Sequence, residues 1–196
     1  MAVDGVGPVN TPAHLILGAA AFSSPNRKRS FWAAILGALA PDVSLYLMAS
    51  VSIFVLGISP GVVFRDYYYS DAWQSVFAVD NSFVLWGVIW VVVFLLRRPL
   101  ALVFASAALL HLALDFPFHT HDARQHFWPI SNWVFESSIS YWDRHAHAGI
   151  VGTFEVALSV ALSIFLLARF RSWIVRGIVV MLLGAELFSS SVWQFL

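Results

Sequence analysis

Residues 31–57 read FWAAILGALAPDVSLYLMASVSIFVLG, a run in which Asp42 is the only charged side chain. A helix needs roughly 20 mainly apolar residues to cross the hydrocarbon core of a bilayer. Further runs of this kind occupy residues 82–96, 99–118, 148–168 and 177–196. The run 82–96 is short, so we expect it to borrow residues from its flanks. The pattern predicts an all-α integral membrane protein with about five transmembrane helices.

The composition agrees with a membrane protein. Hydrophobic residues make up 60% of the 196 residues and charged residues only 11%, whereas a soluble domain has about a quarter charged residues. The 11 basic and 11 acidic residues balance, so nothing points to nucleic acid as a partner. We expect a single polytopic domain over residues 1–196, with the lipid bilayer as its surroundings. The chain has no cysteine, so a bound metal would have nitrogen and oxygen ligands.

The segment 12–22, PAHLILGAAAF, is apolar but too short to span a bilayer. It is either a half-span buried in the protein or a helix that lies at the membrane interface. Pro12 after Thr11 is typical of a helix start, because proline fits the first turn of a helix.

Basic side chains group in alternate connections between the apolar runs. They are Arg27, Lys28, Arg29, Arg97, Arg98, Arg169, Arg171 and Arg176. The positive-inside rule assigns these connections to the cytoplasm. The remaining connections, 58–81 and 119–147, are then the outer loops. We expect a bacterial inner-membrane protein whose His-rich loop 119–147 faces outward.

Polar residues on separate segments fall at a common depth. Counted from the basic ends of the helices, they lie roughly 15–24 Å into the membrane. They are His14, Asp42, Asn81, Ser82, His111, Asp115, Glu155 and Glu186. Ionisable groups at such depth are costly and are usually paired or functional. His111 and Asp115 share one helix face through their i, i+4 spacing, and we expect Pro41 to break the first span beside Asp42.

The densest group of potential ligands is HLALDFPFHTHDARQHFWP, residues 111–129. Imidazole and carboxylate groups bind Zn, Mn, Fe or Ni. We predict that a divalent metal ion is held by His14, Asp42, His111, Asp115 and His119. The simpler alternative is a buried His–carboxylate hydrogen bond that locks two helices together. Residues that either support these ligands or belong to solvated loops are His121, Asp122, His126, Asp143, His145 and His147.

Four short motifs follow one another along the chain. They are His14 on a short apolar segment, Pro41–Asp42 in an apolar run, Asn81–Ser82 before a helix, and His111-x3-Asp115 ahead of Trp128–Pro129. This ordered set resembles the DUF457 (YdjM-like) family of membrane-bound metal-dependent hydrolases, over most of the chain to about residue 130. At position 81 the usual histidine of that family is asparagine. The resemblance implies metal-dependent hydrolysis, with Asn81 and Ser82, which stand at motif positions, as candidate catalytic residues.

The depth of the polar layer suits a lipid or a lipid-linked phosphoester as substrate, with Glu155 as a candidate general base. One rival is a non-enzymatic membrane protein whose polar layer is an ion, proton or metal pathway, or holds helices together. That rival predicts polar residues along the whole depth, whereas the sequence gathers them in one layer. A second rival is an assembly factor that docks through loop 119–147.

Overall fold

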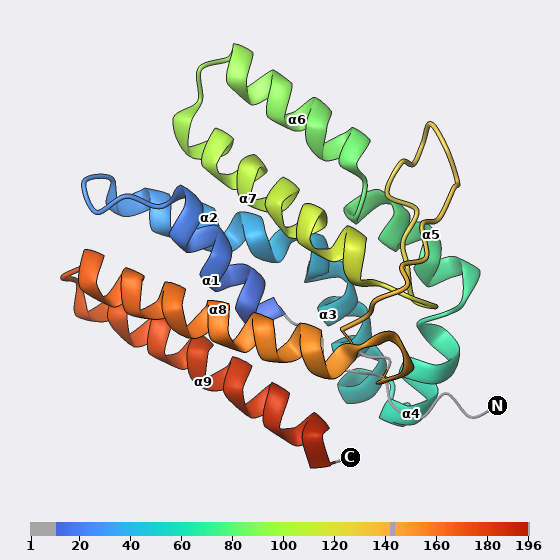
Figure 1. Ribbon diagram of the computed structural model, residues 1–196. Helices are drawn as coiled ribbons and strands as arrows, with labels where there is room; N and C mark the ends of the chain where they lie inside the picture. Colours follow the sequence, from blue (N-terminus) through green and yellow to red (C-terminus); the bar gives the residue numbers. More distant parts are fainter. Residues whose placement is uncertain (1–10, 142–143, 196) are drawn as a thin grey trace.

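The computed structural model describes residues 11–141 and 144–195, which are mostly helical (Figure 1). Four helical stretches are long and apolar enough to cross a membrane: Lys28–Val55, Asp71–Leu95, Pro99–Phe118 and Ala148–Arg169. A further long helix, α9 (Trp173–Phe195), runs beside α8 (Ala148–Arg169). The predicted all-α membrane fold is confirmed, and a fifth crossing by α9 stays a prediction.

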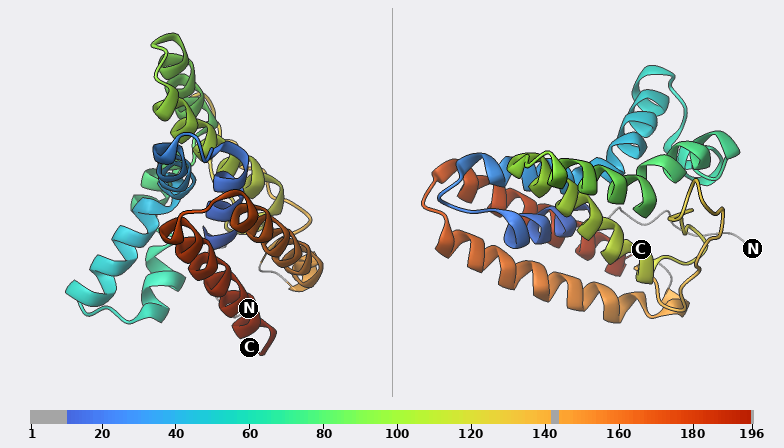
Figure 2. Two further views of the ribbon diagram at one scale, coloured as in Figure 1. Left: turned by 90° about the vertical axis from the view of Figure 1, so that its left-hand side faces the viewer. Right: turned by 90° about the horizontal axis from the view of Figure 1, so that it is seen from above.

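The first crossing stretch changes direction at Pro41. Helix α2 (Lys28–Leu39) ends in a 3-10 turn, η1 (Ala40–Asp42), and the chain continues as α3 (Val43–Ser50) and a π turn, η2 (Val51–Val55). Proline lacks an N–H and its ring clashes with the preceding turn of a helix. Figure 2 shows that α3 leaves the direction of α2. The expected break is therefore present, and it places Asp42 at the corner.

The segment 58–81, expected as an outer loop, is largely helical. It contains α4 (Pro60–Val62), a π turn, η3 (Val63–Tyr67), and α5 (Asp71–Asp80). Helix α5 forms because its apolar face packs on α3. Phe77 of α5, Leu45 of α3 and Tyr68 are buried together in this contact. Helix α6 (Phe83–Leu95) follows directly after α5. Together they form the stretch Asp71–Leu95, so the short apolar run 82–96 is extended on its N-terminal side, as expected.

Helix α1 (Thr11–Phe22) lies in the middle of the bundle. It packs against α2, α8, α9 and α7 (Pro99–Asp115). Its buried residues include His14 and Ile16. Because α1 has only 12 residues and neighbours on several sides, it is buried in the protein, as expected of a half-span, and its insertion into the membrane stays a prediction.

Small residues allow α1, α2 and α7 to approach closely. A side chain added at Gly37 would place its Cβ 2.1 Å from the carbonyl oxygen of Phe104, and one at Gly18 would lie 2.8 Å from Cβ of Ala38. Helix interfaces in membranes use glycine and alanine in this way, because small side chains let backbones meet. This packing brings the face of α7 that carries His111 against the end of α2.

The turns that join α1 to α2, α6 to α7 and α8 to α9 lie at one end of the molecule (Figures 1 and 2). These turns carry the clustered basic residues of the sequence. Residues 119–141 and 144–147 lie at the other end, after the 3-10 turn η4 (Phe116–Phe118), and include the 3-10 turn η5 (Arg144–Ala146). The basic turns therefore share one end, and their assignment to the cytoplasm stays a prediction.

Candidate metal centre

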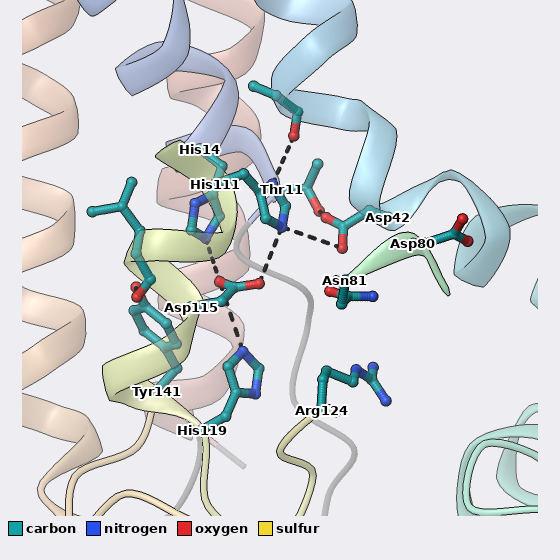
Figure 3. A network of polar contacts seen from close by, with 12 residues as sticks. Thr11, His14, Asp42, Asp80, Asn81, His111, Asp115, His119, Arg124 and Tyr141 are labelled. Atoms are coloured by element: carbon teal, nitrogen blue, oxygen red, sulfur yellow. Dashed lines mark hydrogen bonds and ion pairs between the residues drawn. The ribbon is translucent and has the colours of Figure 1, made fainter. Parts of the chain in front are cut away.

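The predicted ligands converge where three elements meet (Figure 3). His14 comes from α1, Asp42 from the corner η1, and His111 and Asp115 from the last two turns of α7. His119 follows directly after η4. His14, Asp42 and His111 are buried, with 3%, 7% and 1% of their surface exposed. The structure thus brings together all five residues, although their role as ligands stays a prediction.

Asp115 is the common partner of the histidines. Its Oδ1 lies 2.9 Å from Nε2 of His14 and 3.7 Å from Nε2 of His119, and its Oδ2 lies 3.0 Å from Nε2 of His111. The rings of His14 and His111 stack, with centroids 4.3 Å apart. One carboxylate therefore faces three imidazoles from α1, α7 and the segment after it.

His111 is oriented by the backbone of α2. Its Nδ1 lies 2.6 Å from the carbonyl oxygen of Ala38 and therefore donates a proton to it. Its buried Nε2 faces Asp115 and also lies 3.6 Å from Oδ1 of Asp42, but it is not aligned for a hydrogen bond to either. With the ring proton on Nδ1, Nε2 is an acceptor, as are both carboxylates. Three acceptors that face one another require a cation between them, either a proton on Nε2 or a metal ion.

The donor atoms lie nearly as close together as the ligands of one shared ion. Atoms that each lie about 2.1 Å from one ion are about 3.0 Å apart in an octahedron and about 3.4 Å apart in a tetrahedron. One ligand atom each from His14, His111 and Asp115 lies within 4.8 Å of the other two. These three residues form a group that could hold a metal ion.

The carboxylate of Asp42 is fixed from its other side. Thr11, the first residue of α1, donates a short hydrogen bond from its hydroxyl to Oδ2 of Asp42. The hydroxyl of Tyr46 donates to Oγ1 of Thr11 at 2.9 Å. This chain leaves Oδ1 of Asp42 directed at His111. Hydrogen bonds of this kind orient ligating carboxylates in metal sites.

His119 forms a pair with Asp122, which was predicted only as a neighbour of the ligands. Nδ1 of His119 lies 2.9 Å from Oδ2 of Asp122. Burial disfavours a charged imidazole, but the carboxylates of Asp122 and Asp115 outweigh it and raise the pKa of His119 to about 10. Asp122 thus sets the ring orientation of His119 and favours its protonated form.

Asn81 and Ser82 separate α5 from α6. The side-chain amide of Asn81 donates to the carbonyl oxygen of Phe77 at 3.1 Å. Oγ of Ser82 accepts from the backbone N–H of Leu85 at 3.0 Å and donates a short hydrogen bond to the carbonyl of Trp128. Both residues therefore make helix-end contacts, and their catalytic role stays a prediction. In Figure 3, Asn81 lies beyond Asp42, away from His14.

Glu155 is buried on α8, with 8% of its surface exposed. Tyr141 lies beside the cluster, since its ring meets the rings of His14 and His119 at centroid distances of 6.3 and 6.0 Å. Burial raises the pKa of Tyr141, and the charges of Asp115 and Glu155 add to this shift. Glu155 therefore lies close enough for its charge to reach Tyr141, and its role as a general base stays a prediction.

The remaining histidines of the outer segment differ in position. His121, His145 and His147 are exposed, and Asp143 lies outside the described residues. His126 is buried between the rings of Phe83 and Phe116, with its Nδ1 3.0 Å from the carbonyl oxygen of Arg124. Burial lowers the pKa of His126 to about 4. It is thus a neutral packing residue near the cluster.

Several polar residues around the cluster were not singled out by the sequence. Thr11 was used only as a helix start, and Tyr46 and Arg124 carried no motif. Ser159 and Ser163 are fully buried, and their hydroxyls have no hydrogen-bond partner. Their i+4 and i+8 spacing from Glu155 is a signal that could have revealed a polar stripe on α8.

No family model, curated protein or solved structure matches this chain. The resemblance to the DUF457 family therefore stays a prediction. The function has to be inferred from the geometry of the site itself.

Proposed function

We propose that the protein is a membrane-embedded hydrolase that uses a divalent metal ion. The observation that carries the proposal is Nε2 of His111, a buried acceptor that faces the carboxylates of Asp42 and Asp115. A divalent ion can accept a lone pair from all three groups at once, whereas a proton on Nε2 is directed mainly at one of the two carboxylates. Nitrogen and oxygen donors favour Zn, Mn, Fe or Ni.

His14, Asp42, His111 and Asp115 would hold this ion, with His119 at the edge of the group. A bound divalent ion lowers the pKa of a water ligand and polarises an ester oxygen. Asp122 orients His119 through Nδ1, so His119 can carry a proton between the site and the outer segment. Glu155 is the alternative proton acceptor on α8.

A lipid or lipid-linked phosphoester is the proposed substrate. Asp42, His111 and Asp115 belong to two of the stretches that are long and apolar enough to cross a membrane, Lys28–Val55 and Pro99–Phe118. A centre at that position acts on molecules that partition into the bilayer. We further propose that it opens toward the end opposite the basic turns, which the positive-inside rule assigns to the cytoplasm of a bacterial cell.

The direct test is hydrolysis by purified full-length protein loaded in turn with Zn, Mn, Fe and Ni. Substrates are a short-chain phosphatidic acid, a phosphodiester lipid and a matched carboxylic ester, and the readout is product release. We expect turnover with at least one metal and its loss in Asp115→Asn, while His121→Ala, which alters an exposed histidine, retains it. Equal turnover by Asp115→Asn and wild type would contradict the proposal.

A proton pathway is the second candidate function, because the polar stripe extends beyond the cluster. Ser159 and Ser163 lie inside the bundle on the face of α8 that carries Glu155. Buried hydroxyls without partners are costly unless they bind water or protons in transit. Proton flux into vesicles that contain the protein, abolished by Ser159→Ala with Ser163→Ala, would favour this function over hydrolysis.

A further inference from the structure

Residues 127–135 form an apolar tip at the end of the molecule opposite the basic turns (Figure 1). They read FWPISNWVF and contain no charged side chain. Ile130 and Trp133 have 79% and 54% of their surface exposed. The Trp133 ring contacts the rings of Phe127 and Phe135, with centroids 5.8 and 5.9 Å away. A cluster of aromatic rings thus presents large apolar side chains at the surface.

Hydrogen bonds hold both arms of the apolar tip. On its N-terminal side, the backbone N–H of Phe83 donates to the carbonyl oxygen of His126 at 2.8 Å. On its C-terminal side, the N–H of Ser137 donates to the carbonyl oxygen of His119 at 2.9 Å. The first contact fixes the tip to the start of α6, and the second fixes it to the chain directly after α7 and η4. The exposed side chains therefore have a defined place beside α6.

The apolar tip continues one face of α6. The ring of Phe83, the first residue of α6, lies 6.0 Å from that of Phe127. A shallow groove of about 430 Å³ begins at Phe83 and follows this face of the helix, lined by Phe83, Val84, Gly87, Val88, Val91 and Val92. The three last valines are 56%, 49% and 46% exposed. Because α6 belongs to a stretch that is long and apolar enough to cross a membrane, this face is the one that meets lipid.

Helix α6 is short for a membrane crossing. Its 13 residues extend roughly 20 Å, whereas the hydrocarbon core is about 30 Å thick. Helix α5 lengthens the stretch, but polar residues, Asp80, Asn81 and Ser82, mark the junction of the two helices. An apolar surface beside this junction reduces the mismatch between α6 and the bilayer. Tryptophan favours this depth, where acyl chains meet the lipid headgroups.

We propose that the apolar tip inserts into the membrane interface beside α6, with Ile130 and Trp133 among the lipid headgroups and the first acyl carbons. The lipid bilayer is the partner because the tip extends a lipid-facing helix surface and carries no charge. The tip is not helical, and irregular backbone is not stable in the hydrocarbon core, so insertion stops at the interface. The proposal requires neither a bound metal nor hydrolysis.

The chain has no cysteine, so a spin label can be attached at one chosen residue. The test variants are Ile130→Cys and Trp133→Cys. Val88→Cys on the lipid-facing side of α6 and Arg171→Cys in the exposed turn between α8 and α9 are the references. Full-length protein is reconstituted into phosphatidylcholine vesicles, and electron paramagnetic resonance measures how often each label collides with oxygen and with a water-soluble nickel chelate. Oxygen concentrates among acyl chains and the chelate is excluded from them, so the ratio of the two rates reports lipid contact.

We expect the oxygen-to-chelate ratio at Ile130→Cys and Trp133→Cys to be several-fold higher than at Arg171→Cys and no higher than at Val88→Cys. Ratios equal to that of Arg171→Cys would place the tip in water, as a site for a soluble protein requires, and would overturn the proposal. Dipolar broadening between labels on two chains would show that a second copy covers the tip, and would also overturn it. Ile130→Cys decides if the two variants differ, because it leaves the aromatic cluster intact.

Discussion

Nε2 of His14 lies 2.9 Å from Oδ1 of Asp115, and this contact joins the short helix α1 to the end of α7. Helix α1 is too short to cross a membrane, yet it occupies the centre of the bundle. Its first residues, Thr11 and His14, both reach the cluster. We interpret α1 as the element that delivers these two side chains to the candidate metal centre.

The hydroxyl of Thr11 should control how tightly the centre holds an ion. Thr11→Val keeps the shape of the side chain but removes the hydrogen bond to Asp42. Loss of such an orienting contact typically lowers metal affinity by about 10- to 100-fold. Competition with a chromophoric chelator measures the change. Thr153→Val is the control, since Thr153 is exposed and donates within α8. Equal affinity in Thr11→Val and wild type would remove Thr11 from the site.

The close approach of α2 and α7 should make Gly37 intolerant of any side chain. The Cβ in Gly37→Ala would meet the carbonyl oxygen of Phe104 at 2.1 Å, so the helices must separate. We expect a loss of about 1–3 kcal/mol in the free energy of unfolding. Gly152→Ala on α8 meets nothing within 4 Å and should leave the apparent Tm unchanged or raise it. Thermal unfolding in detergent compares them, and similar Tm values for both variants would contradict this packing.

His126 should make the fold sensitive to mild acid. Burial lowers its pKa from 6.5 to about 4 in the folded protein. Between those values the unfolded chain binds a proton that the folded protein excludes, so the free energy of unfolding falls as pH falls from 6.5 to about 4. The loss is about 3 kcal/mol over the whole window. In His126→Gln we expect a shallower dependence of Tm on pH, and equal slopes would show that another group titrates.

Much of the fold could be predicted from the hydropathy pattern and the position of a helix-breaking proline alone. The apolar runs became the long helices, and Pro41 broke the first of them beside Asp42. The i, i+4 spacing of His111 and Asp115 put both on one face of α7, where their side chains meet. These features are local or follow from the thickness of the bilayer, which is why one sequence suffices to predict them.

Other features depend on contacts between distant parts of the chain. The segment 58–81 has mixed polarity, and its α5 forms because Phe77 packs against Leu45 and Tyr68. The stacking of Arg124 on the Phe77 ring belongs to the same tertiary packing. Depth counting placed Asn81 in the polar layer but could not reveal that its amide bonds to the end of α5. The apolar pattern of a single helix does not show which side chains of a neighbouring helix its own side chains will contact.

The central claim is that the cluster around Asp115 holds a divalent ion, and elemental analysis of detergent-purified protein tests it most directly. We expect about one Zn, Mn, Fe or Ni ion per wild-type chain and a large loss in Asp115→Asn and His111→Ala. His121→Ala, which alters an exposed histidine, should retain the ion. Wild-type protein that holds none of these metals after loading, or Asp115→Asn that holds as much as the wild type, would contradict it.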